Sequence, residues 1–205
     1  MFDMASRELY AGCKELLSML HLVEQQQIRE ENRNLLEKLK RLVARTGSEV
    51  FACPSNEEKE FIKILGTLES IELDRVADTG YPIFKPSMGG AALEQLASGS
   101  DLVTLNPAAN VASHFRKINE ELLFNRWCFC RSATVELQIR MDLTTETVEW
   151  FRKSTFEKIK LVADAGINLT QLNVGSKFIY HAAKGLNLGP QHRNVMSLCI
   201  QAGRA

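Results

Sequence analysis

The stretch from Leu9 to Val43 decides the fold, and it reads LYAGCKELLSMLHLVEQQQIREENRNLLEKLKRLV. Apolar residues recur in it at steps of four and three, which is the spacing of a coiled-coil seam. The first set is Leu9, Cys13, Leu16, Leu20 and Val23, and the second is Ile28, Leu35, Leu39 and Leu42. The second set keeps the spacing only if Asn32 counts as a member. Because so narrow a stripe needs a partner, we expect an amphipathic helix packed against another element.

A polar block, Glu24–Gln27, separates the two apolar sets. The step across it is five residues, so either the stripe rotates around one helix or the chain forms two helices. Glutamine does not break helices, and we expect one long helix over 5–45, capped by Gly47. We predict that the set before the block joins another copy of the chain, and that the set after it packs within the chain. The predicted self-association residues are Leu9, Cys13, Leu16, Leu20 and Val23.

Composition indicates a globular intracellular protein. Hydrophobic residues make up 45% and charged residues 24% of the 205, which are ordinary globular values. Five cysteines are an odd number without a disulfide framework, which favours reduced thiols and predicts a cytoplasmic location. Acids near the N-terminus do not suit a signal peptide, and no apolar run approaches the roughly 20 residues of a membrane span. We therefore expect no membrane partner.

The remaining patterns are mostly helical. Ser55 and Glu58 have capping-box spacing and predict a helix over 56–77. Two prolines and three glycines make 79–90 a loop or hinge. We divide the chain into an N-terminal helical self-association region (1–78), this hinge, and a C-terminal helical domain (91–205). Further helices are expected over 91–97, from Asn106–Pro107 to Trp127, from Thr144 to Gly166, and from a Thr170 cap to Ala182, followed by a short amphipathic tail at 195–200.

One segment departs from helical spacing. Apolar and polar residues alternate over 134–143, which is typical of a half-buried strand. Such a strand needs a pairing partner, and 102–105 or another subunit could supply it; otherwise tertiary contacts make the segment helical. The predicted fold class is thus mainly α: a helical bundle with a long N-terminal amphipathic helix and, as one alternative, a short strand or hairpin around 134–143.

No motif is specific for catalysis, a cofactor or a metal. Cys128 and Cys130 lack zinc-ligand spacing and sit beside aromatic residues, so we expect them to pack in the core. Val174–Lys177 resembles only the end of a phosphate-binding loop, and Gly89–Gly90 only opens a helix; ordinary loop chemistry explains both. We therefore predict a protein that is not an enzyme, with no cofactor and no metal site.

Clusters of basic residues carry the functional hypothesis. Acids outnumber bases in 1–101 and bases outnumber acids in 102–205. Dispersed Lys and Arg can hold phosphate backbones without reading bases, although solvated helix faces look the same. The leading hypothesis is a self-associating helical protein that binds nucleic acid, RNA in particular; a protein-interaction adaptor is the alternative, and an enzyme with an unrecognised site comes third. The predicted nucleic-acid-binding residues are Lys38, Lys40, Arg41, Arg45, Arg116, Lys117, Arg152, Lys153, Lys160, Lys177 and Lys184.

Overall fold

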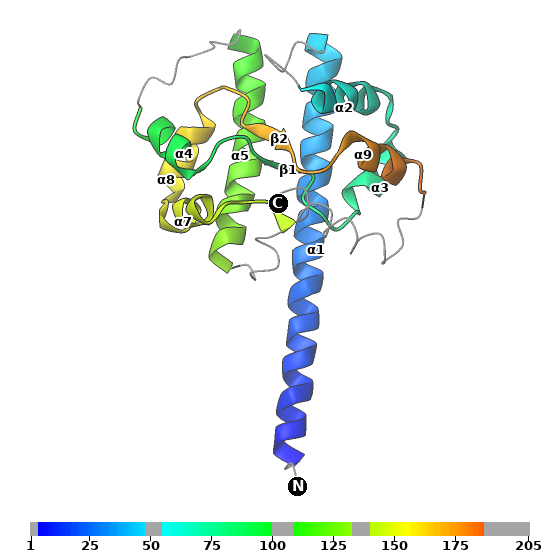
Figure 1. Cartoon of the computed structure of the whole chain (residues 1–205), viewed down its shortest axis with the longest axis vertical. Coiled ribbons are helices and arrows are strands. Elements are labelled where there is room, and N and C mark those ends of the chain that lie inside the picture. Colours follow the sequence, from blue (N-terminus) through cyan, green and yellow to red (C-terminus); the bar gives the residue numbers. More distant parts are fainter. Residues whose placement is uncertain (1–3, 48–54, 100–108, 133–139, 187–205) are drawn as a thin grey trace.

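The protein is mainly α-helical, as predicted (Figure 1). The computed structural model describes residues 4–47, 55–99, 109–132 and 140–186, with helix side chains described from Leu22 in the first helix and over 112–131 in the fifth. The elements are α1 (Met4–Thr46), α2 (Asn56–Thr67), α3 (Ser70–Ala77), β1 (Phe84–Pro86), α4 (Gly90–Ala97), α5 (Ala109–Ser132), α7 (Thr145–Lys153), α8 (Phe156–Ala163), β2 (Thr170–Leu172) and α9 (Ser176–Ala183). None of the described helices is long and apolar enough to span a membrane.

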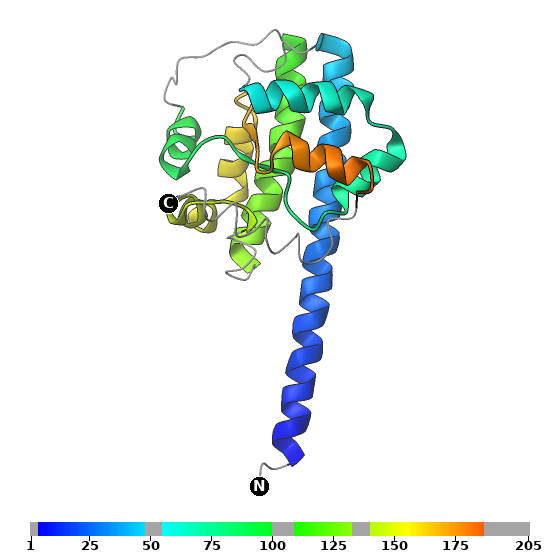
Figure 2. The ribbon, with the colours of Figure 1, turned by 45° about the vertical axis from the view of Figure 1, so that its right-hand side comes forward.

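The first helix, α1, is continuous through the polar block, which confirms one long helix rather than two. It ends at Thr46, and Gly47 follows with a φ of 69°, a left-handed conformation that glycine adopts without strain. The N-terminal part of α1 projects beyond the rest of the molecule in both views (Figures 1 and 2). We call residues 4–23 the arm.

The helices α1 and α5 form the central pair of the body. Contacts between them run from Glu31–Arg126 through Asn34–Glu121 and Lys38–Glu121 to Arg45–His114, so the helices are antiparallel. Helices α2, α3 and α9 lie on the α1 side, and α4, α7 and α8 on the α5 side (Figure 1). The central pair thus separates two groups of short helices.

Each group of short helices packs on a hydrophobic core of its own. The first core joins the C-terminal half of α1 to α2, α3 and α9, and includes Leu35, Leu39, Leu42, Phe61 and Phe178. The second joins α5 to α4, α7 and α8, and includes Leu93, Leu123, Phe151, Ile159 and Val162. Residues from both sides of 79–90 enter the first core. The three-part division of the sequence stays a prediction.

The predicted helix over 56–77 is wrong, because two helices occupy this range. The capping box of Ser55 and Glu58 opens α2 as predicted. Leu68, however, takes an extended conformation with its side chain buried, and a second capping box of Glu69 and Glu72 opens α3. Burial of Leu68 and a new cap therefore outweigh continuity of the helix.

The predicted helix from Thr144 to Gly166 is also two helices. Thr144 caps α7 by accepting a hydrogen bond from the Thr147 N–H at 3.2 Å. Ser154 is extended, and the Thr155 side chain then caps α8 by accepting from the Lys158 N–H at 3.3 Å. Serine and threonine side chains compete with helical hydrogen bonds, which explains the break.

The described sheet lies where no strand was predicted. β1 pairs antiparallel with β2, with Phe84 opposite Leu172 and Pro86 opposite Thr170. Part of the predicted loop at 79–90 is therefore a strand, and Thr170 belongs to β2 instead of capping the last helix, which Gly175 precedes. Of the predicted strand at 134–143, the described residues 140–143 form no strand and include a turn at Met141–Asp142. Its other residues, the suggested partner 102–105, the start at Asn106–Pro107 and the tail at 195–200 lie outside the described residues.

Buried polar groups fasten α1 to the rest of the body. Asn32, the uncertain member of the second apolar set, donates to the carbonyls of Ala77 and Tyr81 and accepts from the Ile83 N–H at 2.9 Å. Glu31, the residue before Asn32, forms an ion pair of 2.7 Å with Arg126 of α5, and both side chains are fully buried. Asn32 within the stripe and Glu31 beside it thus make buried contacts with segments distant in sequence.

Candidate nucleic-acid interface

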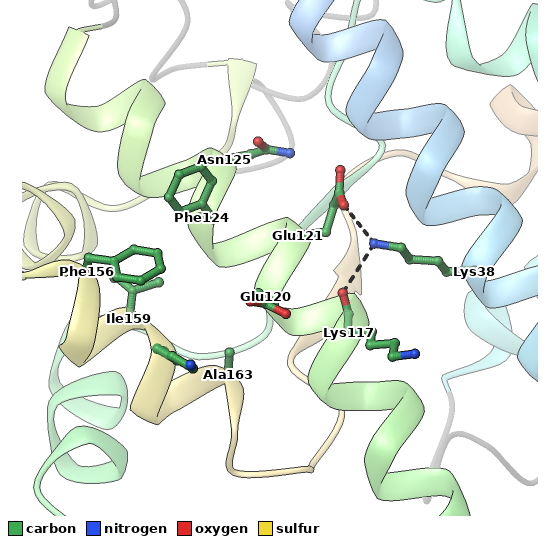
Figure 3. Close-up of a pocket in the computed structure, with 10 residues that line it drawn as sticks. Lys38, Lys117, Glu120, Glu121, Phe124, Asn125, Phe156, Ile159 and Ala163 are labelled. Carbon is green, nitrogen blue, oxygen red and sulfur yellow. Dashed lines mark hydrogen bonds and ion pairs between the residues drawn. The ribbon is translucent and has the colours of Figure 1, made fainter.

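A groove between α1, α5 and α8 brings together three of the predicted basic residues (Figure 3). Its volume is about 530 Å³, within the range of roughly 300–1,000 Å³ that ligand sites occupy. The lining residues are Lys38, Lys117, Glu120, Glu121, Phe124, Asn125, Phe156, Ile159, Lys160 and Ala163.

The two walls formed by α5 and α8 have the same helical spacing. On α5, the lining residues 117, 120, 121 and 124 lie three and four positions apart, and on α8 so do 156, 159, 160 and 163. Residues at these steps share one face of a helix. Each wall therefore combines one exposed lysine, Lys117 or Lys160, with one phenylalanine, Phe124 or Phe156.

The phenylalanines belong to an aromatic cluster that is partly open to solvent. Phe124 and Phe156 meet edge to face, with ring centroids 5.8 Å apart and planes at 88°. Trp127 contacts both rings and donates from Nε1 to the Ser154 carbonyl at 2.9 Å. The Arg131 guanidinium lies 4.8 Å from the centre of the Trp127 ring, a favourable cation–π distance. The hydrogen bond of Trp127 therefore holds the cluster against α7, while the rings of Phe124 and Phe156 stay exposed.

Charge in the groove is partly neutralised. Lys38 donates to Glu121 at 2.7 Å and to the Lys117 carbonyl at 3.4 Å (Figure 3). Burial alone would raise the pKa of Glu121, but hydrogen bonds from Lys38 and Asn34 outweigh it and hold that pKa below its ordinary value. Within the described part of the chain, Lys117 and Lys160 enter no ion pair. These two lysines are the cations that the groove offers to a ligand.

The other predicted basic residues do not line this groove. Lys153 closes α7 while Lys160 lies in α8, so these two lysines do not share one helix, as the single helix predicted from Thr144 to Gly166 would have required. The basic residues outside the groove contact other groups of the chain. Those paired with a carboxylate are Arg41 (Glu37), Arg152 and Lys153 (both Glu149) and Lys184 (Glu72), and Lys177 lies near Glu57. Lys40 and Arg116 donate to the backbone carbonyls of Leu68 and Asp164, and Arg45 contacts the His114 ring. Most of the predicted set is thus already engaged by carboxylates or backbone carbonyls.

The predicted self-association residues lie along the arm. Its backbone is helical, so the four-and-three spacing keeps these positions on one helical face. The side chains of the first four, Leu9, Cys13, Leu16 and Leu20, lie outside the described residues. The fifth, Val23, is 53% exposed, and its neighbour Leu22 is 61% exposed. The end of the arm nearest the body is therefore open to solvent.

Both glycine segments that could hold an anion at a helix start are filled by carboxylates of the same chain. Glu146 accepts from the Ala91 N–H at 2.9 Å at the start of α4. Glu57 accepts from the Ser176 N–H at 2.9 Å and hydroxyl at 2.7 Å at the start of α9. The Ser176 N–H lowers the pKa of Glu57 most. Both glycine segments therefore make hydrogen bonds within the chain, as expected for ordinary loops.

Sequence reasoning missed the aromatic part of the groove. It also gave no sign that Arg126 of α5 is buried against Glu31. Burial raises the pKa of Cys130 to about 11, as suits a core residue, but Cys128 is exposed rather than packed in the core. One sequence pattern could have indicated this surface: Lys117, Phe124 and Arg131 are seven residues apart and therefore lie on one face of the helix.

Comparisons of the chain with models of known protein families, with curated proteins and with solved structures found no significant match. Function is therefore inferred from the residues of the chain itself.

Proposed function

We propose that this protein is a non-enzymatic, self-associating helical protein that binds nucleic acid, RNA in particular, through phosphate contacts. The observation that carries the proposal is the groove, in which two exposed lysines lie beside exposed aromatic rings and form no ion pair with any described residue. Basic side chains interleaved with aromatic ones are typical of surfaces that bind single-stranded nucleic acids. Lys117 and Lys160 would contact phosphates, and the cytoplasm is the proposed location because the odd cysteine number favours reduced thiols.

The arm supports the self-association part of the proposal. A coiled-coil seam buries its apolar positions only against a helix with matching spacing, and a second copy of the arm has that spacing. Leu22 and Val23, more than half exposed, mark where burial by a partner would begin. A homo-oligomer would place several grooves on one assembly, and several weak sites together bind a long polymer more tightly than one.

An adaptor that binds another protein through the arm is the second candidate. The observation in its favour is that five of the eleven predicted basic residues, among them Arg41, Lys153 and Lys184, form ion pairs with carboxylates. A lysine already paired with a carboxylate loses that partner when it binds a phosphate, so these residues would contribute little to RNA binding.

A mobility-shift titration with RNA tests the proposal. Lys117→Glu with Lys160→Glu should weaken binding and reduce the slope of log affinity against log salt by about two, because each lysine releases one phosphate counterion. The charge-matched control is Lys153→Glu with Lys184→Glu, which replaces two lysines outside the groove and should have a smaller effect. If the wild type gives no shift at low salt, RNA binding is wrong and the adaptor remains.

A further inference from the structure

The two phenylalanines of the groove are unusually exposed for their size. Phe124 leaves 38% and Phe156 leaves 44% of its surface to solvent, whereas the core residues Phe61 and Phe151 leave 1% and 0%. Two rings that meet edge to face present one flat face and one edge to a ligand. A planar aromatic ligand could therefore stack on this pair without moving the core.

Both lysines lie toward the same end of the groove from the rings, because α5 and α8 are antiparallel: Arg116 bonds to Asp164 at that end and Phe124 meets Phe156 at the other. On α5, Lys117 is seven residues from Phe124, roughly 10 Å along the helix axis. On α8, Lys160 is four residues from Phe156, roughly 6 Å along the axis. A planar group on the rings would thus have a cation on each wall, both toward the same end of the groove, an arrangement that fits a nucleobase whose phosphates on that side point toward the lysines.

Stacking, more than charge, should dominate this site. The lining carries Lys38, Lys117 and Lys160 against Glu120 and Glu121, which leaves only a small positive excess. A surface that held duplex phosphates by charge alone would need more unpaired cations than this. Aromatic rings gain from bases only when the base faces are accessible, as they are in single strands and loops.

We propose that the groove binds single-stranded RNA by stacking a base on one ring of the Phe124–Phe156 pair, with the other ring against its edge, while Lys117 and Lys160 hold the phosphates on one side of that base. This inference rests on the nucleic-acid binding proposed above and specifies its ligand. Trp127 packs against both phenylalanine rings, and the Arg131 guanidinium lies over the Trp127 ring and adds a positive charge beside the cluster.

The test compares a single-stranded oligo(U) of roughly 16 nucleotides with an RNA duplex of the same length, by fluorescence anisotropy with the full chain. We expect the wild type to bind the single strand about tenfold more tightly than the duplex. Phe124→Leu with Phe156→Leu keeps apolar volume and removes the aromatic faces, and it should weaken single-strand binding about fivefold or more. Phe124→Tyr with Phe156→Tyr is the matched control and should retain binding.

A second readout reports on the groove directly. The chain has two tryptophans, and Trp150→Phe leaves Trp127 as the single emitter. Binding of oligo(U) should change the Trp127 emission, because Trp127 contacts both phenylalanine rings. This signal separates binding in the groove from binding elsewhere on the protein.

The outcomes distinguish this inference from the function on which it rests. Equal binding of single strand and duplex, unaffected by the leucine variants but weakened by Lys117→Glu with Lys160→Glu, would overturn stacking and leave phosphate binding in place. No binding of either RNA at low salt would overturn both. A single-strand preference lost with leucine and retained with tyrosine would support the inference.

Discussion

The two halves of α1 share one helix and one spacing of apolar residues but have opposite environments. Leu22 and Val23 in the arm are 61% and 53% exposed, whereas Leu35 and Leu39 in the body are fully buried. The polar block Glu24–Gln27 lies between these two environments. The comparison teaches that spacing alone does not tell which part of an apolar stripe the body of the chain buries, and that an interruption of the spacing can mark the point where this burial begins.

The largest expected loss of stability comes from a substitution in the C-terminal half of α1, which lies in the body. Leu39→Asp would bury a charge in the first core and should cost more than about 4 kcal/mol, which is most of the stability of a domain near the lower end of the usual range of about 5–15 kcal/mol. Circular dichroism and urea denaturation would measure the loss. Leu22→Asp, in the exposed half, should change the stability of the monomer by less than about 0.5 kcal/mol. Equal destabilisation by both variants would contradict the division of α1.

Breaking the buried ion pair between Glu31 and Arg126 should give the second largest loss of stability. Arg126→Met would leave the Glu31 carboxylate buried without its partner, which should cost about 3–5 kcal/mol in urea denaturation. Glu31→Leu with Arg126→Met removes both charges and should recover most of that loss. A double variant no more stable than Arg126→Met would show that charge pairing is not the cause.

The same pair has a pH dependence with a defined sign. Burial raises the pKa of Glu31, and Arg126 opposes this rise. Without Arg126 the raised pKa lets the folded state take up a proton before the unfolded state does. The stability deficit of Arg126→Met should therefore shrink as the pH falls from neutral toward the ordinary pKa of glutamate.

A smaller effect should follow from Asn32, the polar member of the buried stripe. Asn32→Leu removes three hydrogen bonds to the segment 77–83 and leaves the Ile83 N–H buried without this acceptor. We expect a loss of about 1–3 kcal/mol in urea denaturation. Gln26→Leu is the control. Among the described residues the Gln26 side chain donates a hydrogen bond only to the exposed Glu30, so this substitution should be nearly neutral. A stabilised Asn32→Leu variant would mean that Asn32 is not a structural contact.

Local signals in the sequence predicted part of the fold well. The continuous α1, the capping box at Ser55 and the cap at Thr144 depend on residues close in sequence, and all are present. The breaks at Leu68 and Ser154 were missed because they depend on burial and on caps that compete with helix continuation. The β1–β2 pairing joins residues 84–86 to 170–172, and no local pattern signals a contact over that separation.

The candidate site was predicted only in part, for a related reason. Lys38, Lys117 and Lys160 were among the predicted residues, but nothing in the sequence says that α1, α5 and α8 meet at one groove. Pairing of Lys38 with Glu121, or of Lys184 with Glu72, likewise needs the tertiary structure. Residue type therefore identified candidates, and only packing separated exposed cations from paired ones.

The most direct test of the two-part helix is size-exclusion chromatography with light scattering, on the wild type and on Leu16→Asp with Leu20→Asp. At a concentration on the order of tens of micromolar, the wild type should be a multiple of the 23.1 kDa chain. The arm variant should be monomeric with an unchanged circular dichroism unfolding curve for the body. A monomeric wild type, or an arm variant with the same mass as the wild type, would contradict the claim that the arm joins copies of the chain.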